Sequence, residues 1–161
     1  MVMAIGSMDN SKNVAGETRH KKAEVYYHST SSWETKASYP FHETINSFEI
    51  IAHSDSFILF GGFHVDEQIS TDFHETGTIA QFNPGSNEWT KLGELQTGRH
   101  GFGVIEVDTK YLVMGGFGEK STEICELKNE TIECTSREPT LNQFRYYPAM
   151  MMVASNYADN C

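Results

Sequence analysis

The sequence predicts an all-β protein built from repeated units of four short antiparallel strands. The first observation is an apolar run that ends in Gly-Gly-Phe and occurs twice, as FILFGGF at 57–63 and as YLVMGGF at 111–117. The second is a pair of apolar, aromatic or sulfur-bearing residues spaced seven positions apart, which occurs three times with turn-forming residues between its members. Repetition of both patterns indicates copies of one structural unit.

The first half of each unit is expected to be a hairpin. Residues 48–62 and 102–116 align without a gap, and each segment holds two apolar runs separated by a short polar break. The breaks, at 54–55 and 108–109, are of the kind that joins antiparallel strands, which we name A and B. Strand B then ends at the doubled glycine, where a residue without a Cβ permits a sharp turn and the close approach of another backbone.

A second hairpin, of strands C and D, is expected around each seven-residue spacing. The pairs are Tyr26 with Trp33, Phe82 with Trp89, and Leu127 with Cys134. A Trp on the outer strand can pack its large face against the adjacent sheet. The residues expected to carry the structural motif are Gly61, Gly62, Trp33, Phe82, Trp89, Gly115 and Gly116.

These features resemble kelch repeats. The resemblance rests on the doubled glycine, the later aromatic residue or Trp, and an Arg before the next strand, Arg99 in GRHGFGVIEV and Arg145 in FRYYPAMMMV. It covers residues 22–154, and the second unit departs from the pattern because Cys134 stands where a Trp is expected. The resemblance implies four-stranded blades of a β-propeller, in a family that usually binds other proteins.

The blades are too few to close a propeller. Strands C and D of one blade are expected at 23–38, full blades at 45–93 and 101–136, and a strand A of another at 145–154. Closed propellers have four to eight blades, so the sequence predicts an incomplete propeller. A fragment of a longer protein is the favoured interpretation, and self-association through the open sheet edges is an alternative.

Domain organisation follows from the extent of the repeats. Residues 22–161 are expected to form the kelch-repeat domain. Residues 1–21 are rich in polar and small residues, so they are expected to be a flexible, disordered leader without a signal peptide.

Composition limits the partners. The formal net charge of −10 over 161 residues, without a basic stripe, argues against nucleic acid. No apolar stretch reaches the roughly 18–20 residues of a membrane helix, so membrane insertion is not expected.

One segment has the residue types of a metal site. The expected B–C loop at 63–77 contains His64, Asp66, Glu67, Asp72, His74 and Glu75, and imidazole with carboxylate is a usual ligand set for zinc or manganese. The spacing is irregular, so we expect a solvated acidic loop with no metal, cofactor or catalytic residue. The alternative is a galactose-oxidase-like or metal-dependent enzyme domain on a kelch propeller, since that scaffold also hosts a copper oxidase.

The favoured function is a non-catalytic module that binds another protein through one rim. In a meander the B–C and D–A loops share a rim, and here that rim mixes aromatic with charged residues, as interfaces do. The residues expected to contact the partner are Tyr39, Phe41, His42, His64, Asp66, Glu67, Asp72, His74, Arg99, His100, Lys120, Arg145 and Tyr146.

The cysteines raise a question of cellular compartment. If Asn129-Glu130 is a two-residue turn, Cys125 and Cys134 lie opposite each other in a pair without hydrogen bonds, whose Cα separation of about 4.5–5.5 Å suits a disulfide. A longer turn would break this register, and two reduced thiols are the alternative. A bridge favours an extracellular protein and free thiols a cytoplasmic one, so the localisation stays open.

Overall fold

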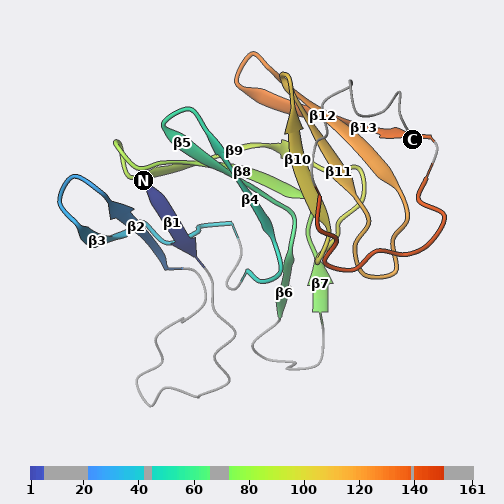
Figure 1. The fold of residues 1–161 in the computed structure, drawn as a ribbon, viewed down its shortest axis with the longest axis horizontal. Helices are drawn as coiled ribbons and strands as arrows, with labels where there is room; N and C mark the ends of the chain where they lie inside the picture. Colours follow the sequence, from blue (N-terminus) through green and yellow to red (C-terminus); the bar gives the residue numbers. More distant parts are fainter. Residues whose placement is uncertain (6–21, 42–44, 66–72, 139, 151–161) are drawn as a thin grey trace, which may run out of the picture.

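The computed structural model describes residues 1–5, 22–41, 45–65, 73–138 and 140–150. Every regular element in these ranges is a β-strand, and the strands form three sheets (Figure 1). No helix in the described part of the chain is long and apolar enough to cross a membrane. The predicted all-β class is therefore confirmed.

The first sheet is three-stranded and antiparallel, in the order β1-β2-β3. Its strands are β1 (Val2–Ile5), β2 (Ala23–Tyr27) and β3 (Ser32–Lys36). The expectation of a flexible leader over residues 1–21 was wrong at Val2–Ile5, because these apolar residues pair with β2 in the position of a strand B. The rest of that segment lies outside the described residues.

Two four-stranded blades follow, each with its strands in the chain order A, B, C, D. Blade 1 consists of β4 (Glu49–His53), β5 (Ser56–Phe60), β8 (Thr78–Asn83) and β9 (Glu88–Glu94). Blade 2 consists of β10 (Gly103–Val107), β11 (Lys110–Met114), β12 (Thr122–Lys128) and β13 (Thr131–Arg137). A short hairpin of β6 (Phe63–Val65) and β7 (Phe73–Glu75) extends the B–C connection of blade 1.

The two blades are joined at their outer strands, which the sequence did not predict. β9 and β13 pair in parallel, Gly93 with Ile132 and Glu94 with Glu133, so that both blades belong to one eight-stranded sheet. A Cβ on Gly93 would collide with the carbonyl oxygen of Ile132, so this approach requires glycine. The inner strands β4 and β10 also lie in contact.

The doubled glycines turn the chain where two backbones meet. Gly61 and Gly115 have φ values of +53° and +72°, which favour a residue without a Cβ. A Cβ on Gly61 would lie 2.8 Å from the carbonyl oxygen of Arg99, and one on Gly115 would lie 2.7 Å from that of Arg145. The run ending in Gly-Gly is therefore repeated because each blade brings the loop before the next strand A against the end of its strand B.

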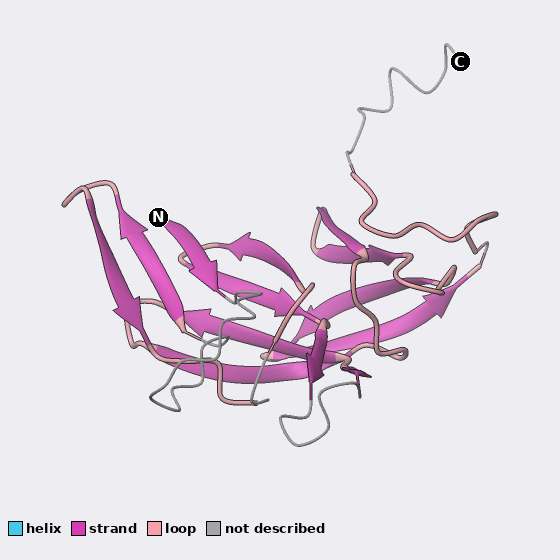
Figure 2. Ribbon diagram, turned by 90° about the horizontal axis from the view of Figure 1, so that it is seen from below, coloured by secondary structure: helices cyan, strands magenta, loops and turns pink. Residues whose placement is uncertain are grey.

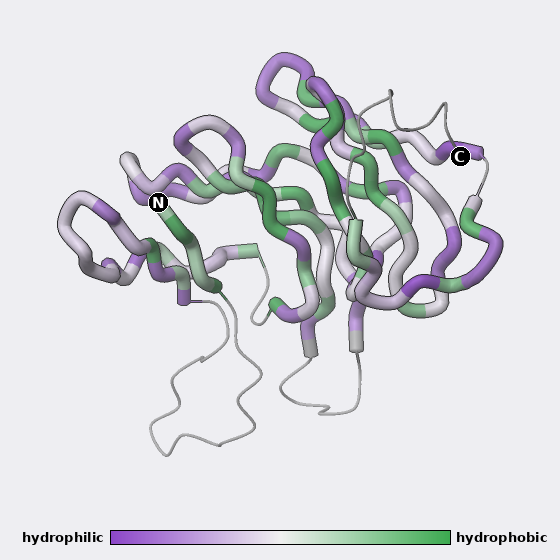
Figure 3. The backbone as a smooth tube through the Cα atoms, in the orientation of Figure 1, coloured by the Kyte–Doolittle hydropathy of each residue, from purple (hydrophilic) through white to green (hydrophobic). Residues whose placement is uncertain are grey.

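The core consists of side chains packed between blades 1 and 2 and between blade 1 and the first sheet. Figure 2 shows the strands of these units after a quarter turn from Figure 1. One layer fills the space between blades 1 and 2 and contains Phe60, Phe102 and Tyr111. The other lies between blade 1 and the first sheet and contains Val25 and Phe82. Apolar residues follow the strands while polar ones gather at hairpin tips, as Figure 3 shows.

Trp89 packs between sheets, as its position on a strand D predicts. Its ring lies 4.9 Å from Phe82 and 5.2 Å from Tyr39, centroid to centroid, and its Nε1 donates to the carbonyl oxygen of Ala37 at 2.9 Å. Trp33 has the corresponding place in the first sheet and pairs with Tyr26, but it is 52% exposed. The difference arises because no described residue of the chain covers that face of the first sheet.

Blade 2 carries a disulfide where the other sheets carry an aromatic pair. Cys125 lies opposite Cys134 in the predicted register, with 2.06 Å between the two sulfurs and 4.0 Å between the Cα atoms. Asn129 and Glu130 form the two-residue turn, both with positive φ. The predicted correspondence of Leu127 to Phe82 was wrong, as the pairing with strand B shows. Cys125 is paired with Tyr111 as Phe82 is paired with Phe57, so Cys125 corresponds to Phe82.

The expected last strand A at 145–154 is not present in its described part. Residues 145–150 have no regular secondary structure, and the remainder of that range lies outside the described residues.

Candidate functional site

The B–C and D–A connections gather at one rim of the molecule, at the bottom of Figure 1. The hairpin β6–β7, the segment before β10, the turn after β11 and the chain beyond β13 meet there. Residues from all four segments come together around His100.

His100 is half-buried at the centre of this rim. Its Nδ1 lies 2.7 Å from Oε1 of Glu75, at the end of β7. Its ring centroid lies 5.0 Å from that of Phe63, 5.4 Å from Phe117 and 5.8 Å from Tyr146. His100 therefore contacts the carboxylate of Glu75, in the B–C hairpin of blade 1, and the rings of Phe117 and Tyr146, which follow strands B and D of blade 2.

Four large aromatic side chains of this rim are exposed to solvent, and two of them, Phe117 and Tyr146, contact His100. Their exposed fractions are 63% for Phe117, 58% for Phe144, 49% for Tyr146 and 58% for Tyr147. We name these four residues together with His100 the aromatic rim cluster. Aromatic residues are enriched at the centres of protein interfaces, so the cluster has the composition of a binding surface.

Contacts within the chain fix the positions of these side chains. The rings of Tyr146 and Tyr147 are in contact, with centroids 4.2 Å apart and planes tilted by 36°, and the hydroxyl of Tyr147 lies 2.6 Å from Oγ of Ser47. The hydrogen bond with Tyr147, more than the slight burial, raises the pKa of Tyr146. Lys120 Nζ lies 4.7 Å from the centre of the Phe144 ring. A surface whose side chains are already positioned loses less entropy when a partner binds.

The two histidines of the predicted acidic loop stack on each other. His64 on β6 and His74 on β7 are paired across the hairpin, with ring centroids 5.2 Å apart and planes at 29°. Asp66, Glu67 and Asp72 lie outside the described residues, as does His42. The role of these residues in binding stays a prediction.

Two predicted rim residues are buried, which is a correction. Tyr39 and Arg99 are 0% and 1% exposed, so neither can contact a partner. Tyr39 packs against Trp89 and the half-buried Phe41, and burial raises its pKa despite a hydrogen bond with Thr78 that acts in the opposite direction. The polarity of a side chain alone does not distinguish an exposed rim residue from a buried one whose polar groups are hydrogen-bonded inside the protein.

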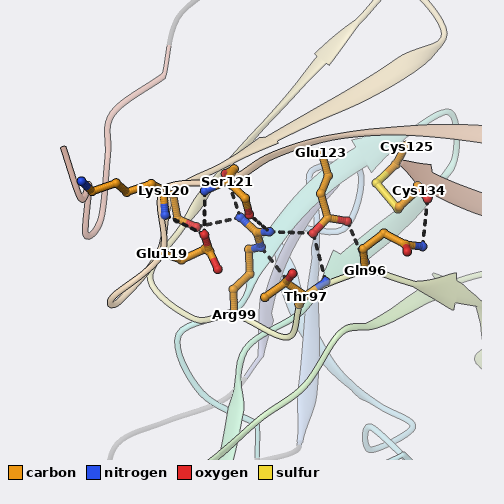
Figure 4. Close-up of polar contacts among 10 residues, drawn as sticks. Gln96, Thr97, Arg99, Glu119, Lys120, Ser121, Glu123, Cys125 and Cys134 are labelled. Carbon is orange, nitrogen blue, oxygen red and sulfur yellow. Dashed lines mark hydrogen bonds and ion pairs between the residues drawn. A yellow bond between two sulfur atoms is a disulfide. The ribbon is translucent and has the colours of Figure 1, made fainter. Parts of the chain in front are cut away.

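Arg99 is held by a network of acceptors, shown in Figure 4. Its Nη2 donates to Glu123 Oε1 at 2.6 Å and to Ser121 Oγ at 2.7 Å, and its Nη1 donates to the carbonyl oxygens of Gly115 and Ser121 at 2.9 and 3.1 Å. Glu123 is 0% exposed and also accepts from two backbone amides, those of Gln96 and Thr97. Arg99 thus ties the loop before blade 2 to strands B and C of that blade.

Three residues of this site, Phe117, Phe144 and Tyr147, were not predicted from the sequence as contact residues. Glu75 was predicted only as part of the acidic loop, and its contact with His100 was not. Phe117 follows the second Gly-Gly as Phe63 follows the first, and that equivalence was visible. The structure adds that Phe63 is only 8% exposed while Phe117 is 63% exposed.

One described cluster has the residue types of a metal site, namely Glu123, Cys125 and Cys134. The two sulfurs are bonded to each other and the carboxylate is paired with Arg99, so these three residues do not offer a free ligand set.

Comparison with known proteins finds similarity to kelch-like protein 15 of several organisms. The chain is 28% identical over 108 residues to kelch-like protein 15 of Mus musculus and of Homo sapiens, and 26% identical to that of Danio rerio. The match covers 67% of this chain but spans only 17% of each relative's length. No family model matches the chain.

A search of solved structures gives the structure of YjhT, with a TM-score of 0.49 and 17% identity over 66% of this chain and 28% of that one. Three other observations define the fold: the doubled Gly-Gly hairpins, the two four-stranded blades and the similarity to kelch-like protein 15. These three agree with the resemblance that the sequence predicts: the chain is built from kelch-type propeller blades, arranged as an incomplete propeller.

Proposed function

We propose that the chain is a non-catalytic module that binds another protein through the aromatic rim cluster. The observation that carries this proposal is the group of exposed aromatic side chains around His100. Exposed aromatic groups of this kind mark sites where a partner covers apolar surface.

Exposure of Phe117 is not simply a consequence of the chain having few blades. The amide of Phe117 donates to the carbonyl oxygen of His100 at 3.1 Å, and its ring contacts both His100 and Tyr146. Phe63 is similarly bridged to Asn46 and packed on His100. Both rings therefore have their neighbouring loops in place, and yet one of them stays open to solvent.

The charges beside the cluster favour a partner with acidic and apolar groups. Lys120 lies next to Phe144, with its Nζ 4.7 Å from the centre of the ring, in a chain whose net charge is −10. Such a local cation within an acidic protein attracts an acidic partner to this rim, with an association rate that falls as salt increases.

The experiment is affinity enrichment of partners with the wild-type chain and with the double variant Phe117→Ala/Tyr146→Ala. The matched control is Leu127→Ala, which truncates a side chain that is 38% exposed at the hairpin tip between β12 and β13, away from the rim. We expect the same proteins to be retained by wild type and control and lost from the double variant.

Direct titration of a retained protein then measures the effect. Truncation of interface hot spots costs about 2 kcal/mol or more each, so the dissociation constant should rise at least thirtyfold for the double variant and stay within threefold for the control. Equal binding by all three chains, or loss of binding with Leu127→Ala, would contradict the proposed surface.

A further inference from the structure

Among the described residues, the first sheet has three strands where each blade has four. In blade 1 strand β4 lies beside β5, and in blade 2 strand β10 lies beside β11. β1 has the place of strand B, but it is the edge of its sheet in the described part of the chain. In the described part of the chain, the first sheet therefore corresponds to strands B, C and D of a blade, and its strand-A position is open.

The register of the sheets shows which of their residues correspond. Tyr26 lies opposite Trp33 as Phe82 lies opposite Trp89 and Cys125 opposite Cys134. Counting back two residues along strand C, Glu24 corresponds to Ala80 and to Glu123. On strand B, the residues paired with Glu24, Ala80 and Glu123 are Ala4, Leu59 and Val113, in that order.

The loops that lead into strand A correspond in the same way. Ser47, Gly101 and Tyr147 all have a positive φ, of 49°, 59° and 50°. The amide of Gly62 donates to the carbonyl oxygen of Arg99 at 2.8 Å, and that of Gly116 donates to the carbonyl oxygen of Arg145 at 2.9 Å. Ile45, Arg99 and Arg145, each two residues before the positive φ, are therefore equivalent.

The equivalent residues make matched pairs within the chain. Ile45 packs with Ala80 in one apolar cluster, and Arg99 pairs with Glu123 at 2.6 Å. The third pair consists of Arg145 and Glu24, which are both exposed. Glu24 is on β2 and Arg145 is in the segment after β13, and these two parts of the chain lie at opposite ends of the molecule (Figure 1). Among the described residues, Arg145 has no carboxylate partner at one end of the molecule, and Glu24 has no arginine partner at the other.

We propose that a second copy of this chain completes the propeller, so that Arg145 of each copy pairs with Glu24 of the other. The loop at 145–150 leads toward the missing strand-A position of the partner's first sheet. Each copy then contributes three blades, and two copies give six, within the range of closed propellers. The two contacts are related by twofold symmetry, which is the commonest symmetry of soluble oligomers.

The surfaces beside this pair are apolar, as the contact requires. On the first sheet, Val2 and Trp33 are 48% and 52% exposed and flank Tyr26 across the strands. On the outer face of blade 2, Ile105, Leu112 and Ile124 form a cross-strand row of half-buried side chains. Within the described chain, no other sheet covers either face.

The first measurement is the mass of the 161-residue chain in solution by analytical ultracentrifugation or light scattering. We expect twice the 18.1 kDa of one chain, independent of dilution well above the dissociation constant. A monomer, or a series of larger species that grows with concentration, would overturn closure by two copies.

The decisive measurement uses charge reversal. Arg145→Glu and Glu24→Arg each place like charges at both contacts of a dimer, so each variant alone should dissociate with a dissociation constant raised at least about tenfold. Mixed in equal amounts, they should form a dimer of wild-type mass, because both contacts then join a carboxylate to a guanidinium. That rescue also shows that both variants are folded.

Arg137→Glu is the matched control, since it makes the same change in charge at an exposed residue at the end of β13. It should dimerise like wild type and gain nothing from mixing with Glu24→Arg. If Arg145→Glu stays dimeric, or if the mixture of the two charge-reversed variants does not associate, the pairing of Arg145 with Glu24 is wrong.

Discussion

Replacing Arg99 with Met should destabilise the fold strongly even though no partner touches this residue. The substitution keeps much of the apolar volume but removes the donors to Glu123, to Ser121 Oγ and to three backbone carbonyl oxygens. It leaves the carboxylate of Glu123 fully buried with only two backbone amides as donors. Removing one member of a buried ion pair costs about 3–5 kcal/mol.

That loss is a large fraction of the roughly 5–15 kcal/mol that stabilises a typical domain. The assay is denaturant unfolding of wild type, Arg99→Met, Glu123→Leu and the double variant, at one fixed chain concentration because association shifts apparent stability. Each single variant should lose about 3–5 kcal/mol, and the double variant should lose clearly less than their sum because neither charge is then left unpaired.

Arg137→Met is the control, and it should change the free energy of unfolding by no more than about 0.5 kcal/mol because Arg137 is exposed. An Arg99→Met variant as stable as this control would refute the reasoning. Strict additivity of the two single substitutions would also refute it, since the cost would then not arise from their interaction.

Three further outcomes are expected. Non-reducing peptide mapping should recover Cys125 and Cys134 in one linked peptide. Reduction should lower the free energy of unfolding by at most about 2–3 kcal/mol because the bridge closes a short loop. Free thiols at both positions in unreduced material would count against the bridge. Measured in the Arg145→Glu background, where the chain should be monomeric, Trp89→Ala should cost about 3 kcal/mol in denaturant unfolding and Trp33→Ala less than about 1 kcal/mol, because Trp89 packs between sheets while Trp33 is 52% exposed in the single chain. Burial, assisted by Glu106, raises the pKa of Tyr111 to about 12, so ultraviolet titration of wild type should show a late-ionising phenol that Tyr111→Phe lacks, in addition to that of the buried Tyr39. The stability that Tyr111 contributes through this shift should be present below pH 10 and lost as the pH rises toward 12. A late phase of the titration that is unchanged in Tyr111→Phe would contradict this.

Much of the fold could be predicted because the repeats carry it. The hairpins, the ends of strand B and the register that places Cys125 opposite Cys134 all follow from local spacing and turn chemistry. β1 was missed because polar residues follow it for a long stretch, although Val2–Ile5 is followed by Gly6 as Ser56–Phe60 is followed by Gly61.

The candidate site was harder to predict because exposure depends on contacts between blades. Arg99 and Arg145 open similar segments, yet one is buried against Glu123 and the other is exposed. The parallel contact of β9 with β13 likewise joins residues that no local pattern connects. Such features depend on how neighbouring blades meet, which one repeat does not encode.

The join between β9 and β13 also determines how the molecule can open. Blades 1 and 2 are in contact at their inner strands and hydrogen-bonded at their outer ones, so they should undergo amide hydrogen exchange as a single cooperative unit. The first sheet is held to blade 1 by side-chain packing and by the bonds of Ala37 to Asn87 and Trp89. It can separate without breaking a strand pairing, and β2 and β3 should therefore exchange their amide hydrogens through smaller, local openings than the blades do.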